Sequence, residues 1–411
     1  MLTIKIAKRI TNKAIEYLQQ LLIPIEKRWV ISLEPESPAI GNVLLSYILK
    51  PFDLKKGESI PVSHTHFWEC MQMAQTFLDM GYSVDCIHFQ NKAFIPQKDY
   101  DFFIDVRLNL QRSFPYLNPD CIKIFHADTA HLLFHNAAEA KRLVELQQRR
   151  GITLNPRRYE APNQALESAD YAMVLGNDFT LGTYAYANKP MYKIPISTPT
   201  TYPWFDRDFD KCRKNFLFFS SGGMVHKGLD LLLDVFSQMP DYHLTICGPV
   251  DREEDFVKAF HKELYETPNI HTVGWVDVTG QQFQEIMKNS VGLVYPSCSE
   301  GQSGAVISCL HGGLIPILSY ESGVDVNDFG VILQNCSLEK IKAAIVDISS
   351  RSSRELSAMS RGAWEYARAN HTKERFAEVY RNTILDIQKH HREKSAIASI
   401  STSRNYLLVA R

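Results

Sequence analysis

Residues 295–319 read YPSCSEGQSGAVISCLHGGLIPILS, a pattern typical of a strand, a polar turn, a short helix and a second strand. Ser303 is a suitable N-cap for a helix over residues 305–310, and the glycine pair 312–313 can end that helix because glycine adopts positive φ. Residues 315–318 are again apolar and strand-like. In a parallel sheet, such a unit directs the first amides of the helix beyond the carboxyl end of the strand, where they attract anions. The stretch therefore predicts an α/β fold with an anion site at one sheet edge.

Glu300 is the acidic residue of this polar turn. A carboxylate beside an anion site suits a ligand that carries both a phosphate and a sugar, because the amides bind phosphate oxygens and the carboxylate accepts hydrogen bonds from hydroxyls. A polar turn with one acid is also common as an ordinary solvated turn, so this stretch alone does not decide between the two.

A second stretch, residues 216–233, reads FLFFSSGGMVHKGLDLLL. A buried strand runs into Gly222 and Gly223, and a helix begins near Lys227. Glycines let backbone amides approach a phosphate closely, and a lysine adds a point charge near the same oxygens. Taken alone, this loop is equally well a tight turn between a strand and a helix.

The composition excludes several classes of protein. Lys and Arg number 45 against 46 Asp and Glu, so no overall charge attracts nucleic acid. No apolar run approaches the roughly 18 residues of a membrane span, and the N-terminus shows no signal-peptide pattern. The eight cysteines are scattered without a CxxC pair, so we expect reduced thiols in a cytoplasmic protein rather than disulfides or a metal site.

Helix and strand patterns alternate along the chain and restart after residues 198–213, TPTTYPWFDRDFDKCR. This stretch is the expected boundary between two α/β domains, residues 1–205 and 206–390, followed by a flexible tail over 391–411. Two such domains that face each other form a cleft in which ligands bind. The expected strands are 29–33, 43–48, 84–89, 102–106, 121–125, 171–175, 194–196, 216–219, 244–247, 270–275, 292–295 and 315–318.

The two stretches together resemble the C-terminal domain of GT-B fold glycosyltransferases, specifically the retaining family usually called glycosyltransferase family 4, or glycosyl transferases group 1. Lys227-Gly228 matches the end of the family's glycine-rich loop. Glu300-Gly301 and Ser303-Gly304 match the start and the loop of its second motif. Gly222 stands where the family usually has an arginine, and Ser308 stands where it has a second glutamate.

The resemblance implies two Rossmann-like, doubly wound domains, with the acceptor on the N-terminal side and a nucleotide-sugar donor on the C-terminal side. Lys227 and the glycine-rich loop would hold the diphosphate on one side, and the amides at the start of the 305–310 helix on the other. Glu300 would contact the transferred sugar, and Ser308 would replace the glutamate that binds ribose. No metal or other cofactor is implied, and transfer would retain the sugar's configuration. The implied catalytic residues are Glu300, Lys227 and His126, and the implied donor-binding residues are Gly222, Gly223, Gly301, Gln302, Ser303, Gly304, Ala305 and Ser308.

Histidines of the N-terminal half supply the remaining candidates. His126 follows an expected strand and is the closest match to a family histidine that reaches the donor sugar; a role as a cap of the strand end is the alternative. His64 and His66 begin an expected helix where family members contact acceptors, although histidine at a helix start also serves as a cap. The weaker candidates are His131, Glu69, Asp128 and, as a base by position alone, the loop at Gly274-Trp275.

Three functions from different classes stay open at this stage. The first is sugar transfer to a glycan, lipid-linked sugar, protein or small molecule; the second is a GT-B relative such as a nucleotide-sugar epimerase. The third is a catalytically silent protein that binds a sugar nucleotide or a partner, which the missing arginine and second glutamate favour. A basic amphipathic helix pattern over residues 3–23 and the arginines at 149, 150, 157 and 158 are compatible with an anionic membrane surface, a phosphorylated acceptor or plain solvated faces.

Overall fold

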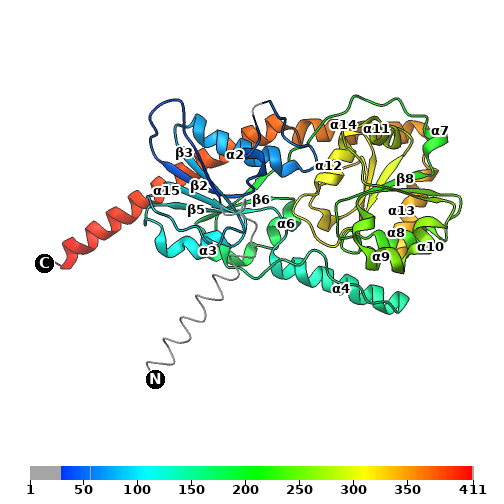
Figure 1. Cartoon of the computed structure of the whole chain (residues 1–411), viewed down its shortest axis with the longest axis horizontal. Coiled ribbons are helices and arrows are strands. Elements are labelled where there is room, and N and C mark those ends of the chain that lie inside the picture. Colours follow the sequence, from blue (N-terminus) through cyan, green and yellow to red (C-terminus); the bar gives the residue numbers. More distant parts are fainter. Residues whose placement is uncertain (1–28, 56, 410–411) are drawn as a thin grey trace, which may run out of the picture.

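The computed structural model describes residues 29–55 and 57–409, and it contains two sheets arranged side by side, each covered by helices (Figure 1). The expected α/β class, with two parallel-sheet halves, is confirmed. We call the parts built on the two sheets the first half and the second half. The basic helix expected over residues 3–23 lies outside the described residues.

The first sheet has seven strands in the order β1-β3-β2-β4-β5-β6-β7, and β1 alone runs antiparallel to its neighbour. Its central strands are buried on both faces, which explains why they read as continuous apolar runs in the sequence. The strands are β1 (Val30–Leu33), β2 (Asn42–Tyr47), β3 (Ser83–His88), β4 (Phe102–Asp105), β5 (Ile122–Ala127), β6 (Tyr171–Leu175) and β7 (Met191–Ile194).

The second sheet is parallel throughout, in the order β10-β9-β8-β11-β12-β13. The order reverses between β8 and β11, the place where open α/β sheets bind ligands beyond the carboxyl ends of their strands. The strands are β8 (Asn215–Phe219), β9 (His243–Cys247), β10 (Ile270–Gly274), β11 (Gly292–Tyr295), β12 (Ile315–Ser319) and β13 (Val331–Leu333).

Helices cover both sheets. In the first half they are α2 (Thr65–Asp79), α3 (Asn109–Ser113), α4 (Leu132–Arg150), α5 (Ala165–Ser168) and α6 (Asp178–Gly182). In the second half they are α7 (Phe209–Cys212), α8 (Leu229–Phe236), α9 (Glu254–Ala259), α10 (His261–Tyr265), α11 (Gln281–Lys288), α12 (Gly304–His311), α13 (Leu338–Ser350) and α14 (Ser353–Asn370), followed by α15 (Lys373–Val409). No helix among the described residues is long and apolar enough to cross a bilayer.

Three elements differ from the sequence expectation. The strand expected at 194–196 is β7, which lies at residues 191–194; it is an edge strand whose exposed Lys193 interrupts the apolar pattern. The pattern of residues 256–264 predicts a single helix, whereas the structure divides this segment into α9 and α10 near Phe260. The edge strand β13 was not predicted, because three residues are too short to show a period.

Two helices connect the halves. The helix α15 packs Phe376, Tyr380, Ile384 and Ile387 into the core of the first sheet, although the sequence boundaries assigned residues up to 390 to the C-terminal domain. Residues 391–409, expected as a flexible tail, continue this helix. In the opposite direction, α4 extends from the first half along the second, where Leu146 joins the core of the second sheet (Figure 1).

Buried neutral histidines predict a loss of stability in mild acid. Burial lowers the pKa of His126, His311 and His371 to about 4, so the folded chain leaves them unprotonated between pH 6.5 and 4 while the unfolded chain protonates them. The free energy of unfolding should therefore fall by about 1.4 kcal/mol per pH unit for each of them across this window. Denaturant unfolding at pH 7.0 and 5.5 measures the fall. His371→Gln should reduce the dependence of the free energy of unfolding on pH by the contribution of one proton. His261→Gln, at an exposed position, should leave that dependence unchanged. An equal pH dependence in the wild-type protein and both variants would contradict the assignment.

Candidate active site

Lys227 and Glu300 meet at the carboxyl ends of two neighbouring strands. Lys227 lies in the loop after β8 and Glu300 in the loop after β11, and the Lys227 ammonium forms an ion pair with Glu300 Oε1. The same oxygen accepts hydrogen bonds from Tyr295 Oη at 3.0 Å and Ser297 Oγ at 2.8 Å. The structure thus brings together the two charged residues that the sequence places in its two motifs.

The electrostatics of this pair favour an ionised carboxylate. Burial by itself raises the pKa of Glu300, but the positive charge of Lys227, together with the smaller effects of His226 and Arg158, outweighs burial and holds that pKa at about 2. Burial lowers the pKa of Lys227, and Glu300 opposes that effect. The lysine side chain is 3% exposed and the glutamate 11%, so the charges act on each other with little solvent screening.

The start of α12 has the expected cap, and its neighbours are already engaged. Ser303 Oγ accepts from the amide of Val306, as predicted for an N-cap, while the Ser303 amide donates to the carbonyl of Ser322. Gln302 does not face a free site: its Oε1 accepts from the Ile196 amide at 2.7 Å, so this side chain joins the two halves.

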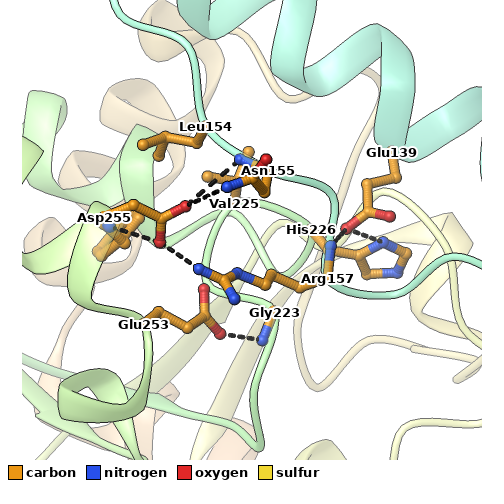
Figure 2. Close-up of a pocket in the computed structure, with 10 residues that line it drawn as sticks. Glu139, Leu154, Asn155, Arg157, Gly223, Val225, His226, Glu253 and Asp255 are labelled. Atoms are coloured by element: carbon orange, nitrogen blue, oxygen red, sulfur yellow. Dashed lines mark hydrogen bonds and ion pairs between the residues drawn. The ribbon is translucent and has the colours of Figure 1, made fainter.

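The glycine-rich loop already holds a carboxylate. The amides of Gly223 and Met224 donate to the side chain of Glu253, which comes from the turn before α9 (Figure 2). The phosphate role predicted for the Gly223 amide therefore requires that Glu253 move away. Gly222 is less confined: a Cβ added there would meet only Glu253, at 3.5 Å.

Ser308 is buried on α12, and its hydroxyl donates to the carbonyl of Gly304 at 2.9 Å. Serine side chains in helices commonly donate to the carbonyl four residues earlier in the same helix. Because the hydroxyl is engaged by its own helix, Ser308→Ala should change nucleotide affinity by less than about threefold. Titration calorimetry with the nucleotide that the protein binds checks this, and a loss of tenfold or more would identify Ser308 as a ribose ligand.

His126 lies within β5 rather than after it, and it is fully buried. Neither ring nitrogen has a hydrogen-bond partner among the described residues, and the ring centroid lies 5.7 Å from that of Tyr47. Burial lowers its pKa to about 4, so the ring is neutral at physiological pH. An unsatisfied buried imidazole is costly, and a ligand hydroxyl is one group that could satisfy it.

The other N-terminal candidates divide into two groups. His66 pairs with buried Glu69 at 2.7 Å, and Asp128 accepts from Tyr47 Oη at 3.3 Å, beside His126. This cluster borders the start of α12, where a Cβ on Gly304 would lie 3.0 Å from Thr65 Oγ1. The remaining candidates lie apart: His131 caps α4 and contacts Tyr186, and Trp275 is 60% exposed at the end of β10.

The sequence reasoning missed the part that α4 plays in the site. His135 on α4 contacts Ser299 Oγ at 3.0 Å, and Arg142 donates to the carbonyl of Pro296 at 3.1 Å, so this helix holds the loop that carries Glu300. In the sequence, the arginines at 149, 150, 157 and 158 draw attention to this region. They are compatible with several functions, so the sequence assigns none of these functions to them.

Comparison with known proteins agrees with this geometry. Residues 213–350 match the model of a family described as glycosyl transferases group 1. Residues 213–350 thus resemble this glycosyltransferase family. This match covers both motifs and also supports the prediction of an enzyme of the glycosyltransferase class. Comparison with curated protein sequences gives no match.

Solved structures of similar fold include sucrose-phosphate synthase from Thermosynechococcus elongatus, with 14% identity, a TM-score of 0.56, and coverage of 87% of this chain and 99% of that one. Anabaena HepE in complex with UDP and glucose has 10% identity and a TM-score of 0.51, with 85% and 99% covered. S. aureus TarM has 13% identity and a TM-score of 0.48; the match covers 68% of this chain but only 54% of TarM. At these identities the likeness concerns the fold, and the predicted resemblance to GT-B glycosyltransferases is confirmed.

Proposed function

We propose that this protein transfers a sugar from a nucleotide-sugar donor to an acceptor hydroxyl, with retention of configuration and without a metal cofactor. The observation that carries the proposal is the buried Lys227–Glu300 pair beside the start of α12, at the point where the strand order of the second sheet reverses. The family match over residues 213–350 supports it, because it covers both partners of the pair.

The proposed reaction begins when the donor displaces the ion pair. The Lys227 ammonium then binds the diphosphate, and the Glu300 carboxylate accepts hydrogen bonds from sugar hydroxyls. The bond between the anomeric carbon and the phosphate oxygen breaks, and that oxygen keeps the bonding electrons. The acceptor oxygen forms the new bond to the anomeric carbon, and its proton passes to the released diphosphate. Positive groups already aimed at the diphosphate stabilise the charge that develops on it.

A second candidate function is a binding protein without turnover. Two carboxylates support it: Glu300 neutralises Lys227, and Glu253 occupies the amide of Gly223. In such a protein Glu300 and Glu253 would stay in place and weaken phosphate binding at all times. In the transferase they weaken it only until the donor displaces them. Replacement of the second family glutamate by Ser308 is consistent with either function.

The test begins with thermal unfolding of the purified protein in the presence of UDP, GDP, ADP and TDP and their common sugars, with and without EDTA. A UDP-sugar is the first probe, because the HepE structure contains UDP. We expect one nucleotide at about one hundred times its Kd to stabilise the fold by about 2.7 kcal/mol, with no effect of EDTA. Release of that nucleotide in the presence of acceptor sugars would support transfer. Binding without release under all acceptors would favour the binding protein, and no shift at millimolar nucleotide would contradict both.

A further inference from the structure

Arg158 is held at the edge of the site by the first half of the chain. Its amide donates to Glu139 Oε1 at 3.0 Å, and its carbonyl accepts from His135 Nε2 at 2.7 Å. Both partners are buried on α4, at 2% and 1% exposure. Because α4 is itself fastened to the second half, the backbone of Arg158 has a fixed position relative to the glycine-rich loop (Figure 2 shows the neighbouring contact of Glu139 with Arg157).

The side chain of Arg158 lies across the glycine-rich loop. A Cβ added to Gly223 would come within 2.7 Å of Arg158 Cγ and 3.0 Å of its Cδ, so the arginine stem rests on this glycine. The positive charge of Arg158 lowers the pKa of Lys227, after the effects of burial and Glu300, and lowers the pKa of Glu300, after those of burial, Lys227 and His226. The arginine is therefore directed from the first half toward the pair in the second.

Arg158 differs from the arginines around it in the contacts of its guanidinium. Within the described residues, the structure records no hydrogen bond or ion pair made by its guanidinium. The neighbouring arginines are all engaged: Arg107 with Asp128 and Glu160, Arg142 with Pro296, Arg149 with Asp230 and Asp234, Arg150 with Asp234 and Glu263, and Arg157 with Asp255.

The charge balance of the site depends on this arginine. Lys227 and Glu300 cancel each other, and Glu253 adds a negative charge at the Gly223 amide, so without Arg158 these groups offer an anion no net attraction. Arg158 adds one positive charge beside them, and its planar fork can donate two parallel hydrogen bonds to a phosphate. Residue 222 of the same loop is a glycine and brings no charge of its own.

We propose that Arg158 binds the diphosphate of the donor and stabilises the charge that it gains as it leaves, so that the first half supplies a catalytic residue to the donor side. This inference rests on the proposed function. Gly223 has a φ of +94°, which already favours glycine, and a Cβ there would in addition displace the arginine stem. This role of Arg158 also couples donor binding to the position of α4, which carries both groups that hold the Arg158 backbone.

The experiment compares the wild-type protein with Arg158→Ala, Arg158→Lys and Arg157→Ala, using the nucleotide identified by thermal unfolding. Titration calorimetry gives the Kd of the nucleoside, the monophosphate and the diphosphate, and turnover gives kcat. Arg157 is the matched control, because it precedes Arg158, shares its backbone contact with Glu139 and directs its guanidinium to Asp255 instead.

For Arg158→Ala we expect a loss of at least about tenfold in diphosphate affinity, little change in nucleoside affinity, and a larger loss in kcat than in affinity. Arg158→Lys should recover part of both, and Arg157→Ala should stay within about twofold of wild type. Loss of selectivity for the diphosphate is a readout that a merely structural role would not produce. Wild-type affinity and turnover in Arg158→Ala would overturn the inference alone, whereas a wild-type protein that binds no nucleotide would overturn the proposed function and the inference together.

Discussion

Lys227→Ala is expected to lower turnover by at least about a hundredfold, and to lower it by more than it weakens donor binding. In the resting protein the Lys227 ammonium faces Glu300 rather than solvent. Part of the free energy gained when Lys227 binds the donor therefore offsets the loss of its ion pair with Glu300. In the transition state the diphosphate carries more negative charge than in the donor, and the attraction of the ammonium is greatest at that point. Steady-state kinetics and calorimetric donor binding, measured on the same preparation, give the two losses separately.

The same substitution has a second, independent consequence for Glu300. Without the ammonium, the largest influence that lowers the pKa of Glu300 is gone, and burial should raise that pKa toward or above its ordinary range. Tyr295 and Ser297 still donate to the carboxylate, so we expect destabilisation at the lower end of the roughly 3–5 kcal/mol that follows removal of one partner from a buried pair.

Lys211→Ala is the control, because Lys211 is a highly exposed lysine of the second half. It should change neither turnover nor the unfolding midpoint. Equal losses of binding and turnover in Lys227→Ala would argue that Lys227 binds the donor without acting on the transition state. Unchanged turnover in a folded Lys227→Ala protein would remove it from the site.

The sequence was sufficient for strands β8 to β12 of the second sheet and for the central pair because these follow from local patterns. Strands of a parallel sheet that is covered on both faces are continuous apolar runs, and β8, β11 and β12 show them, whereas the edge strand β10 alternates between buried and more exposed residues. The loops that carry Lys227 and Glu300 follow the neighbouring strands β8 and β11, so recognition of the two motifs as strand-to-helix units places their side chains together. The cap at Ser303 follows from the same local chemistry.

What the sequence could not supply depends on contacts between distant segments. Glu253 binds the Gly223 amide, Gln302 binds the Ile196 amide, and Arg158 rests on Gly223, yet no local pattern marks these partners. The contacts of Gln302 and Arg158 join the two halves, and the contact of Glu253 joins two separate loops of the second half. The helix α15 was assigned to the wrong neighbour for the same reason: its amphipathic pattern shows that it packs, but not against which sheet.

Gly301→Ala is expected to disrupt the site by displacing the backbone of the loop that carries Glu300. A Cβ at residue 301 would lie 2.3 Å from the Asp128 carbonyl oxygen and 2.6 Å from its carbon, and these backbone atoms cannot rotate away. The Gly301 carbonyl also accepts from Thr180 Oγ1 at 3.0 Å, which ties the loop to the first half on another side. The methyl group must therefore push the loop that carries Glu300 away from β5, and we expect about 1–3 kcal/mol of destabilisation.

The loss of activity in Gly301→Ala should exceed what this destabilisation explains, because a displacement of about 1 Å at a reacting group can cost a hundredfold in rate. Gly182→Ala separates the two effects: a Cβ there meets nothing within 4 Å, and Gly182 has no positive φ, so its stability should change by less than about 1 kcal/mol and its turnover should not change. Turnover measured well below the unfolding midpoint of each variant makes the comparison. If Gly301→Ala retained wild-type turnover, the loop after β11 would have to tolerate movement away from the first half. In that case the close packing of Asp128 on Gly301 would not set the position of Glu300 during the reaction.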